Sequence, residues 1–259
     1  MTGNIILIVP FIFGAVVGSF LNVCIHRIPL GISVVSPPSR CPECKRHVPF
    51  YLNVPIISYF IIGGKCAFCR APLSIKYPVV EALTGFFLAA LFAKFGPGAE
   101  LFVYFTFVSA LIVITFIDLD LQIIPDVISL PGIVIGFVAS FFLPWPGAVN
   151  SAIGIIGGGG VLLLVALVYL KLTGTDGMGG GDVKLLAMIG AFLGWKGALL
   201  TLFAGSLIGA LAGGVVILTS GKSSKHPIPF GPFLAAGALI HLFFGDALIR
   251  WYIMKSIGH

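Results

Sequence analysis

Long runs of apolar residues recur along almost the whole chain and constrain its fold more than any other feature. A helix of about 20 apolar residues crosses a hydrocarbon core of about 30 Å, and eight runs approach or reach that length. They span residues 5–23, 79–93, 101–117, 127–143, 151–170, 183–195, 198–219 and 229–251. Only 9% of the residues are charged, against about a quarter in soluble domains. The sequence therefore predicts an all-α polytopic membrane protein with about eight transmembrane helices.

The lysines and arginines predict how these helices are oriented. If the spans alternate in direction, one side of the membrane carries residues 24–78, 118–126, 171–182 and 220–228. Eleven of the 15 lysines and arginines lie in or beside these segments. Cytoplasmic loops carry the Lys/Arg excess, so this side is expected to face the cytoplasm. The net charge of +6 then reflects topology and contact with anionic membrane lipid, and no nucleic-acid partner is expected.

Four of the five cysteines form two C-x-x-C pairs in the polar stretch after the first apolar run. Cys41 and Cys44 lie in "CPEC", and Cys66 and Cys69 lie in "CAFC". Two such pairs separated by 21 residues suit tetrahedral coordination of Zn²⁺, whereas disulfides are disfavoured in the reducing cytoplasm. Four thiolates leave no position open for water, so the zinc is expected to be structural. The prediction is a first transmembrane helix (1–23), a cytoplasmic zinc-binding loop domain (24–78) and a seven-helix membrane domain (79–259).

Five of the nine acidic residues border two short loops on the predicted cytoplasmic side. These residues are Asp118, Asp120, Asp126, Asp176 and Asp182. Acids inside a bilayer disfavour insertion by about 2.5–3.5 kcal/mol, so acids at span ends usually face a cavity or a partner. On a helix Asp118 and Asp120 would point about 200° apart, so the two cannot face the same partner. Spacing alone leaves open which of the two is functional.

Local patterns offer simpler roles for the remaining acids. Asp126 follows Pro125 before an apolar run, which is typical of a helix N-cap, and Asp176 in "GTDG" is typical of a turn. Asp182 could also cap a helix, but a cap needs none of the three glycines before it. Those glycines would let the backbone pass close to another segment, so that Asp182 approaches an acid from a distant span.

Two carboxylates that meet at a membrane face suggest an aspartic protease dyad. One acid stays protonated and polarises the scissile carbonyl, while the ionised acid takes a proton from water. The same acids also fit a proton-coupled membrane transporter. The spans and the zinc loop alone would fit a noncatalytic assembly platform in a secretion machine, although such a platform does not explain the glycines.

Eight motifs follow one another along nearly the whole chain. They are "GSFLNVCIHRIP" (18–29), "CPEC" (41–44), "NVPIISYF" (53–60), "GGKCAFC" (63–69), "YPVVEALTG" (77–85), "DLDLQIIPDVISLPG" (118–132), "GMGGGDVKLLAMIGAFLGW" (177–195) and "IPFGPFLAAGA" (228–238). The set and its order resemble the type IV prepilin peptidases, bifunctional membrane enzymes of the GxGD aspartic protease group. Each motif alone is weakly specific, whereas their shared order is highly specific.

The resemblance implies a protease site and a substrate class. Carried over by position, it makes Asp118 and Asp182 the catalytic pair, with supporting roles for Gly179, Gly181, Asp120 and Asp126. It also implies that the short basic leader of a prepilin or a type II secretion pseudopilin is cut at the cytoplasmic face of the bacterial inner membrane. The sequence does not identify the client or the oligomeric state.

The resemblance further implies that the new N-terminus is methylated from S-adenosylmethionine. No glycine-rich nucleotide-binding loop or Rossmann pattern is present in residues 24–85. The family links methylation to the zinc loop and its border, which points to Gly64, Lys65 and Glu81. Glu81 is equally compatible with a buried, paired acid at a helix end.

Overall fold

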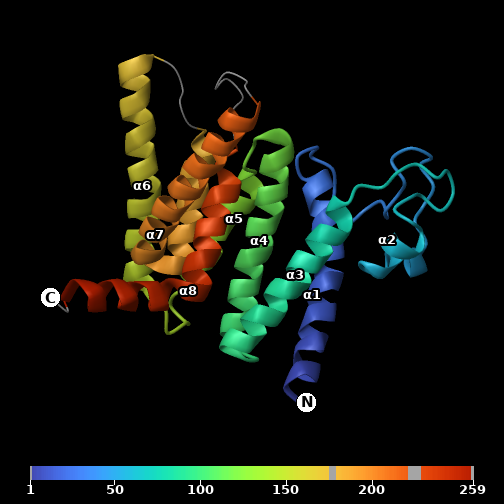
Figure 1. Ribbon diagram of the computed structural model, residues 1–259, viewed down its shortest axis with the longest axis horizontal. Helices are drawn as coiled ribbons and strands as arrows, with labels where there is room; N and C mark the ends of the chain where they lie inside the picture. Colours follow the sequence, from blue (N-terminus) through green and yellow to red (C-terminus); the bar gives the residue numbers. More distant parts are fainter. Residues whose placement is uncertain (1, 175–178, 221–228, 258–259) are drawn as a thin grey trace. The chain divides into compact units, whose positions relative to one another are not determined.

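A computed structural model describes residues 2–174, 179–220 and 229–257, which form helices joined by loops (Figure 1). Within these ranges there is no strand, and the backbone forms only the isolated β-bridges Arg40–His47 and Lys65–Pro72. Helices suit a lipid-facing chain because all their backbone polar groups are satisfied internally. The all-α prediction is therefore confirmed. The chain divides into two compact units, Met1–Val113 and Ile114–His259.

The first unit is built around two long helices with a loop between them. Its elements are α1 (Thr2–Arg27), the 3-10 helix η1 (Phe50–Asn53), α2 (Ile57–Ile61), α3 (Lys76–Phe95) and the beginning of α4 (Ala99–Leu121). Helices α1 and α3 lie side by side (Figure 1). A Cβ at Gly14 would lie 2.7 Å from the Thr84 carbonyl oxygen, and one at Gly18 would lie 2.7 Å from the Glu81 Cα. Small residues thus allow the close helix approach that holds Glu81 against α1.

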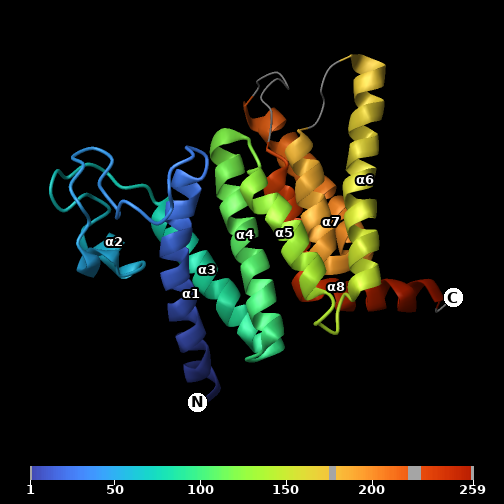
Figure 2. The same ribbon diagram turned by 180° about the vertical axis from the view of Figure 1, so that it is seen from behind.

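The second unit is arranged around α7. Its elements are the end of α4, α5 (Asp126–Ala139), α6 (Ala148–Thr173), α7 (Gly180–Ser220) and α8 (Gly231–Ile257). Helix α7 packs against α5, α6 and α8, as Figure 2 shows from behind. The backbones of α6 and α7 touch where Gly154 faces Gly190, because a Cβ at either glycine would meet the backbone of the other. Glycine pairing therefore sets the closest helix contact in this unit.

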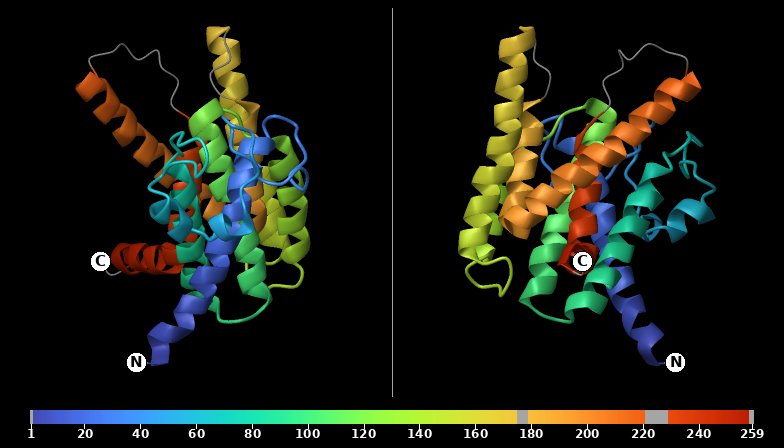
Figure 3. Two further views of the ribbon diagram at one scale, coloured as in Figure 1. Left: turned by 90° about the vertical axis from the view of Figure 1, so that its right-hand side faces the viewer. Right: turned by 60° about the vertical axis from the view of Figure 1, so that its left-hand side comes forward.

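Helix α7 is interrupted at Gly194. This residue has φ 68° and ψ −179°, a conformation that glycine adopts at low cost and that other residues rarely adopt. Figure 3 shows the two parts of α7 running in different directions. The break falls close to the boundary expected between the apolar runs 183–195 and 198–219.

Five of the described helices are long and apolar enough to cross a membrane. They contain residues Ile6–Arg27, Lys76–Phe95, Ala99–Leu121, Ala148–Thr173 and Gly180–Val215. Helix α5 and the apolar part of α8, Gly231–Gly245, are shorter. The chain is thus a multi-pass membrane protein. The count of eight spans remains a prediction, although each predicted run corresponds to a helix or to one part of α7.

Candidate active site and metal centre

Asp118 and Asp182 come together in the second unit although 64 residues separate them in sequence. Asp118 lies in the last turn of α4 and is 4% exposed, whereas Asp182 lies in the first turn of α7 and is half-buried. Their carboxylates lie close enough to interact electrostatically. Two carboxylates in this relationship resist simultaneous ionisation and titrate as a pair. The arrangement can therefore hold one acid and one base side by side.

The first residue of α8 contacts Asp118 directly. The backbone N–H of Gly231 donates a buried hydrogen bond to Asp118 Oδ2, with N and O 2.9 Å apart. A Cβ at Gly231 would lie 2.6 Å from the same oxygen, so only glycine leaves room for this contact. The motif "IPFGPFLAAGA" contains Gly231, but the sequence alone does not predict a role for this glycine. The Gly-Pro pair before an apolar run indicates a helix start, but it does not indicate which distant residue the helix contacts.

Asp120 and Asp126 have surroundings different from those of Asp118. Asp120 is exposed on α4, while Asp118 on the same helix is buried, in agreement with the angle expected between them. The N-cap interpretation of Asp126 is wrong, because Pro125 occupies the N-cap position and Asp126 is the first helical residue. The Asp126 carboxylate instead binds Lys184, whose Nζ lies 2.7 Å from each carboxylate oxygen. This ion pair connects the start of α5 to α7, close to Asp182.

The glycines before Asp182 differ in their surroundings. A Cβ at Gly181 would lie 2.8 Å from the Ile124 Cβ, whereas a Cβ at Gly180 would meet nothing within 4 Å. At Gly179 the nearest atom is Asp182 Oδ2, at an ordinary contact distance of 3.8 Å. Gly181 is therefore the glycine whose lack of a side chain lets the segment after α4 approach α7. Asp176 lies outside the described residues.

The two C-x-x-C pairs form two similar loops in the first unit. In the first loop the Cys41 N–H donates to the Arg46 carbonyl, and in the second the Cys66 N–H donates to the Ala71 carbonyl. The residue after each second cysteine has a positive φ, 59° at Lys45 and 61° at Arg70. This repeated backbone shape turns both cysteines of a pair toward the same point.

The four sulfurs of Cys41, Cys44, Cys66 and Cys69 lie within 4.8 Å of one another. A tetrahedron with Zn–S bonds of 2.3 Å requires sulfurs about 3.8 Å apart. The Cys41 and Cys69 sulfurs are 3.7 Å apart, so the donor set fits zinc. Backbone N–H groups of Cys69 and Phe68 lower the pKa of the Cys66 thiol to about 6. The Ala71 backbone lowers the pKa of Cys69, but burial and the neighbouring thiols outweigh it and raise that pKa to about 11. Cys66 is therefore the first thiol of the cluster to become the thiolate that binds metal. None of the four cysteines forms a disulfide.

The three residues that the resemblance links to methylation have different surroundings in the first unit. Glu81 is buried on α3, and its Oε2 accepts a hydrogen bond from the Ile56 N–H, with a donor–acceptor distance of 2.7 Å. Gly64 has φ 65°, and a Cβ there would lie 2.9 Å from the Tyr59 hydroxyl. Lys65 is exposed in the bridge to Pro72. The Glu81 carboxylate thus binds the loop to α3, whereas the absence of a side chain at Gly64 leaves room for Tyr59.

Similarity to known proteins covers both units. Residues 105–214 match the type IV leader peptidase family, and residues 12–95 match the bacterial peptidase A24 N-terminal domain. A prepilin leader peptidase/N-methyltransferase of Aeromonas hydrophila is 35% identical, over 95% of this chain and 93% of its own length. The chain belongs to the type IV leader peptidase family.

Other relatives extend this family assignment to distant bacteria. Proteins with the same name are 35% identical in Bacillus subtilis, over 96% of this chain and 98% of theirs, and 34% identical in Pseudomonas aeruginosa, over 93% and 91%. No solved structure matches the chain. Membership in the leader peptidase family makes the chain a peptidase, which decides against the transporter and platform alternatives. The family match includes Asp118 and Asp182 and ends before Gly231.

Proposed function

We propose that this leader peptidase cleaves the short basic leader of type IV prepilins or type II secretion pseudopilins with Asp118 and Asp182, and then methylates the new N-terminus. The observation that carries the proposal is the meeting of these two acids, one from the end of α4 and one from the start of α7. The names of the relatives support the substrate class and the second activity.

The contacts of the two acids assign them different tasks. The Gly231 N–H donates to Asp118, and a hydrogen bond to a carboxylate favours its ionised form. Asp118 is then the base that takes a proton from the attacking water. Asp182, half-buried and next to that charge, carries the proton and polarises the scissile carbonyl. Gly181 and Gly231 keep the site narrow enough for the two carboxylates to act together.

The first unit is proposed to carry the methyl-transfer function. The four cysteines would hold Zn²⁺, which folds the loop and leaves no coordination position for water. S-adenosylmethionine, when bound, supplies the methyl group. The residues near the loop border, Glu81 above all, contribute polar groups to this function.

The acidic site is proposed to face the cytoplasm of a bacterial inner membrane. Seven of the 15 lysines and arginines lie in residues 24–78, and alternating spans place this stretch on the same side of the membrane as the span ends that carry Asp118 and Asp182. This excess favours the cytoplasmic orientation. A basic leader would be attracted to the acids around the site, while the apolar helix behind the leader remains in lipid.

One experiment tests both activities. The purified protein is incubated with a prepilin and S-adenosylmethionine, and mass spectrometry measures loss of the leader and gain of a methyl group. Asp118→Asn and Asp182→Asn are each expected to reduce cleavage by about 10⁴-fold or more, because the two acids act as a unit. Glu100→Gln, in the first turn of the same helix as Asp118, is the matched control and is expected to retain most activity. Normal cleavage by either catalytic variant would contradict the dyad.

A further inference from the structure

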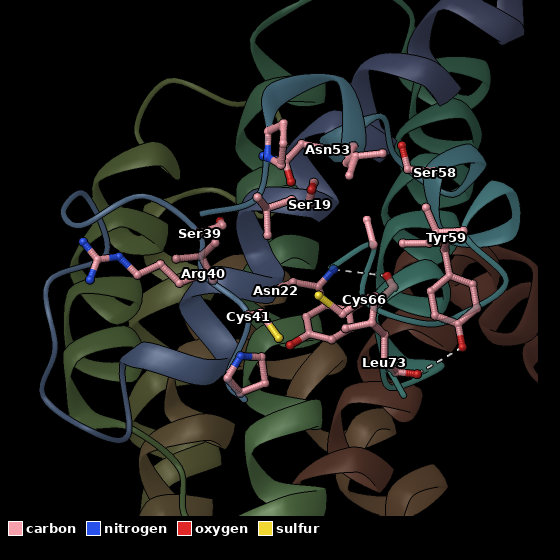
Figure 4. A pocket seen from close by; sticks show the side chains of 18 of the residues that line it. Ser19, Asn22, Ser39, Arg40, Cys41, Asn53, Ser58, Tyr59, Cys66 and Leu73 are labelled. Atoms are coloured by element: carbon pink, nitrogen blue, oxygen red, sulfur yellow. Dashed lines mark hydrogen bonds between the residues drawn. The ribbon is translucent and has the colours of Figure 1, made fainter. Parts of the chain in front are cut away.

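The first unit contains a cavity that the peptidase site does not use. Its volume is about 210 Å³, and it lies among the C-terminal end of α1, the first turns of α3 and the cysteine-containing loop (Figure 4). A water molecule takes up about 30 Å³ in the liquid, so the cavity admits an organic group rather than a single water. It is therefore large enough to be a ligand site.

The side chains at the inner end of the cavity are polar, buried and hydrogen-bonded. Asn22, Ser58 and Glu81 line it and are all buried, each less than 9% exposed. The Asn22 amide donates to the Tyr77 carbonyl, and the Ser58 hydroxyl donates to the Tyr51 carbonyl. Among the described residues that line the cavity, Glu81 supplies the only carboxylate. A buried carboxylate at the end of a cavity favours a positively charged group of a ligand.

The side chains at the opening of the cavity are positively charged. His26, Arg40 and Arg46 line it and are exposed, and in Figure 4 the Arg40 guanidinium points away from Asn22 and Cys66. Arg27 is held in place by the loop, because its guanidinium donates to the Ser33 and Pro37 carbonyls. This charge distribution fits a small ligand with a cation at the inner end and an anion at the opening. The arginines would repel a basic leader, and Glu81 would repel a phosphate.

The cysteine loops form part of the cavity wall. Cys41 and Cys66, one from each pair, line it and are buried. Tyr59 and Leu73 also line it, and the Tyr59 hydroxyl donates to the Leu73 carbonyl. The absence of a side chain at Gly64 leaves room for Tyr59. Two of the residues that the resemblance links to methylation thus contribute to the cavity. Glu81 lines it, and Gly64 leaves room for Tyr59, which also lines it.

We propose that this cavity binds S-adenosylmethionine, with Glu81 facing its sulfonium and Arg40 and Arg46 facing its carboxylate. The inference rests on the proposed methylation and adds the location and the contacts of the methyl donor. In the transfer the neutral α-amine of the cleaved peptide forms a bond to the methyl carbon. The carbon–sulfur bond breaks with its electron pair staying on sulfur, which leaves S-adenosylhomocysteine, and the surplus proton passes from nitrogen to water.

The test is equilibrium binding of radiolabelled S-adenosylmethionine to the purified, zinc-loaded full chain. Glu81→Gln is expected to weaken binding at least about tenfold, as loss of a charged hydrogen-bond partner does. Val54→Trp, which places a large ring in the cavity wall, is expected to abolish binding. The matched controls are Glu43→Gln and Val35→Trp, in the same loop but not lining the cavity, and both are expected to bind like the unaltered protein.

The outcomes separate this site from the proposed function. If Glu81→Gln and Val54→Trp bind S-adenosylmethionine as tightly as the unaltered protein, the cavity is not the donor site, even when the unaltered protein methylates a prepilin. If the unaltered protein cleaves but neither binds the donor nor methylates, the proposed methylation fails and the site fails with it. Zinc content shows whether Glu81→Gln has lost its loop structure, in which case Val54→Trp decides.

Discussion

Gly231 and Asp118, 113 residues apart in sequence, share a buried hydrogen bond in which the glycine N–H donates to the carboxylate over 2.9 Å. Through this bond, the first residue of α8 contacts an acidic residue at the end of α4. Because a Cβ at Gly231 would overlap the carboxylate oxygen, the position admits no larger residue without moving Asp118. Helix α8 is therefore part of the proposed peptidase site through the backbone of Gly231.

Gly231→Ala is expected to reduce prepilin cleavage by about 100-fold, because displacing a reacting group by about 1 Å has effects of that size. Initial rates of leader release, measured on protein in detergent, check the prediction. Gly160→Ala is the matched control, since a Cβ at Gly160 would meet nothing within 4 Å. Equal rates for the two variants would show that Asp118 does not depend on the close approach of α8.

The glycines of the GxGD motif provide an internal comparison. Gly181→Ala is expected to impair cleavage strongly, because its Cβ would press on the Ile124 side chain and move Asp182 away from Asp118. Gly180→Ala, one residue earlier, adds a methyl group in open space and is expected to retain most of the activity. The cleavage rates of the two variants show whether the peptidase needs the space at Gly181. A loss of similar size in both would indicate a need for backbone freedom rather than for space at Gly181.

Local sequence patterns were sufficient to predict the helices and the clustering of the four cysteines. An apolar run of membrane length must be helical in lipid, and two C-x-x-C pairs bring four sulfurs together because each pair forms its own short loop. Helical geometry also predicted that Asp118 and Asp120 face different ways, and the structure buries Asp118 and exposes Asp120. The resemblance then selected Asp118, a choice that spacing could not make.

Apart from the approach of Asp182 to an acid of a distant span, contacts between distant segments could not be predicted in this way. The role of Gly231 depends on its position beside Asp118, which no local pattern encodes. Asp126 was expected to cap a helix, but its partner is Lys184, 58 residues later. The cavity in the first unit arises from the packing of α1, α3 and the loop, so its lining residues share no spacing in the sequence.

The Asp126–Lys184 ion pair is expected to matter less than its short distances suggest. The two side chains are 54% and 38% exposed, and exposed pairs contribute about 1 kcal/mol or less. Lys184→Met should lower thermal stability slightly and cleavage by a few-fold at most. The charge-swapped double variant Asp126→Lys, Lys184→Asp should recover part of the loss. Thermal unfolding at low and high salt measures the contribution of the ion pair to stability, which should decrease as the salt concentration increases. A loss as large as that of Asp182→Asn would show that Lys184 acts in catalysis.

Removal of zinc is expected to unfold the cysteine loop and leave the second unit folded. Cys44→Ser removes one ligand and should lower zinc content and make residues 24–78 sensitive to protease, whereas Cys24→Ser, at a buried cysteine of α1, should retain the metal. The pH dependence follows from Cys66, whose pKa of about 6 lies below the usual thiol value of about 8.5, while the pKa of its neighbour Cys69 is raised to about 11. Stabilisation by the Cys66 thiolate is full above about pH 8.5 and is lost progressively as the pH falls through about 6. Zinc content measured after dialysis from pH 8 to pH 5 should therefore fall only at or below about pH 6, because bound zinc competes further with protons. Release of most of the metal already at pH 7 would contradict a site formed by four thiolates.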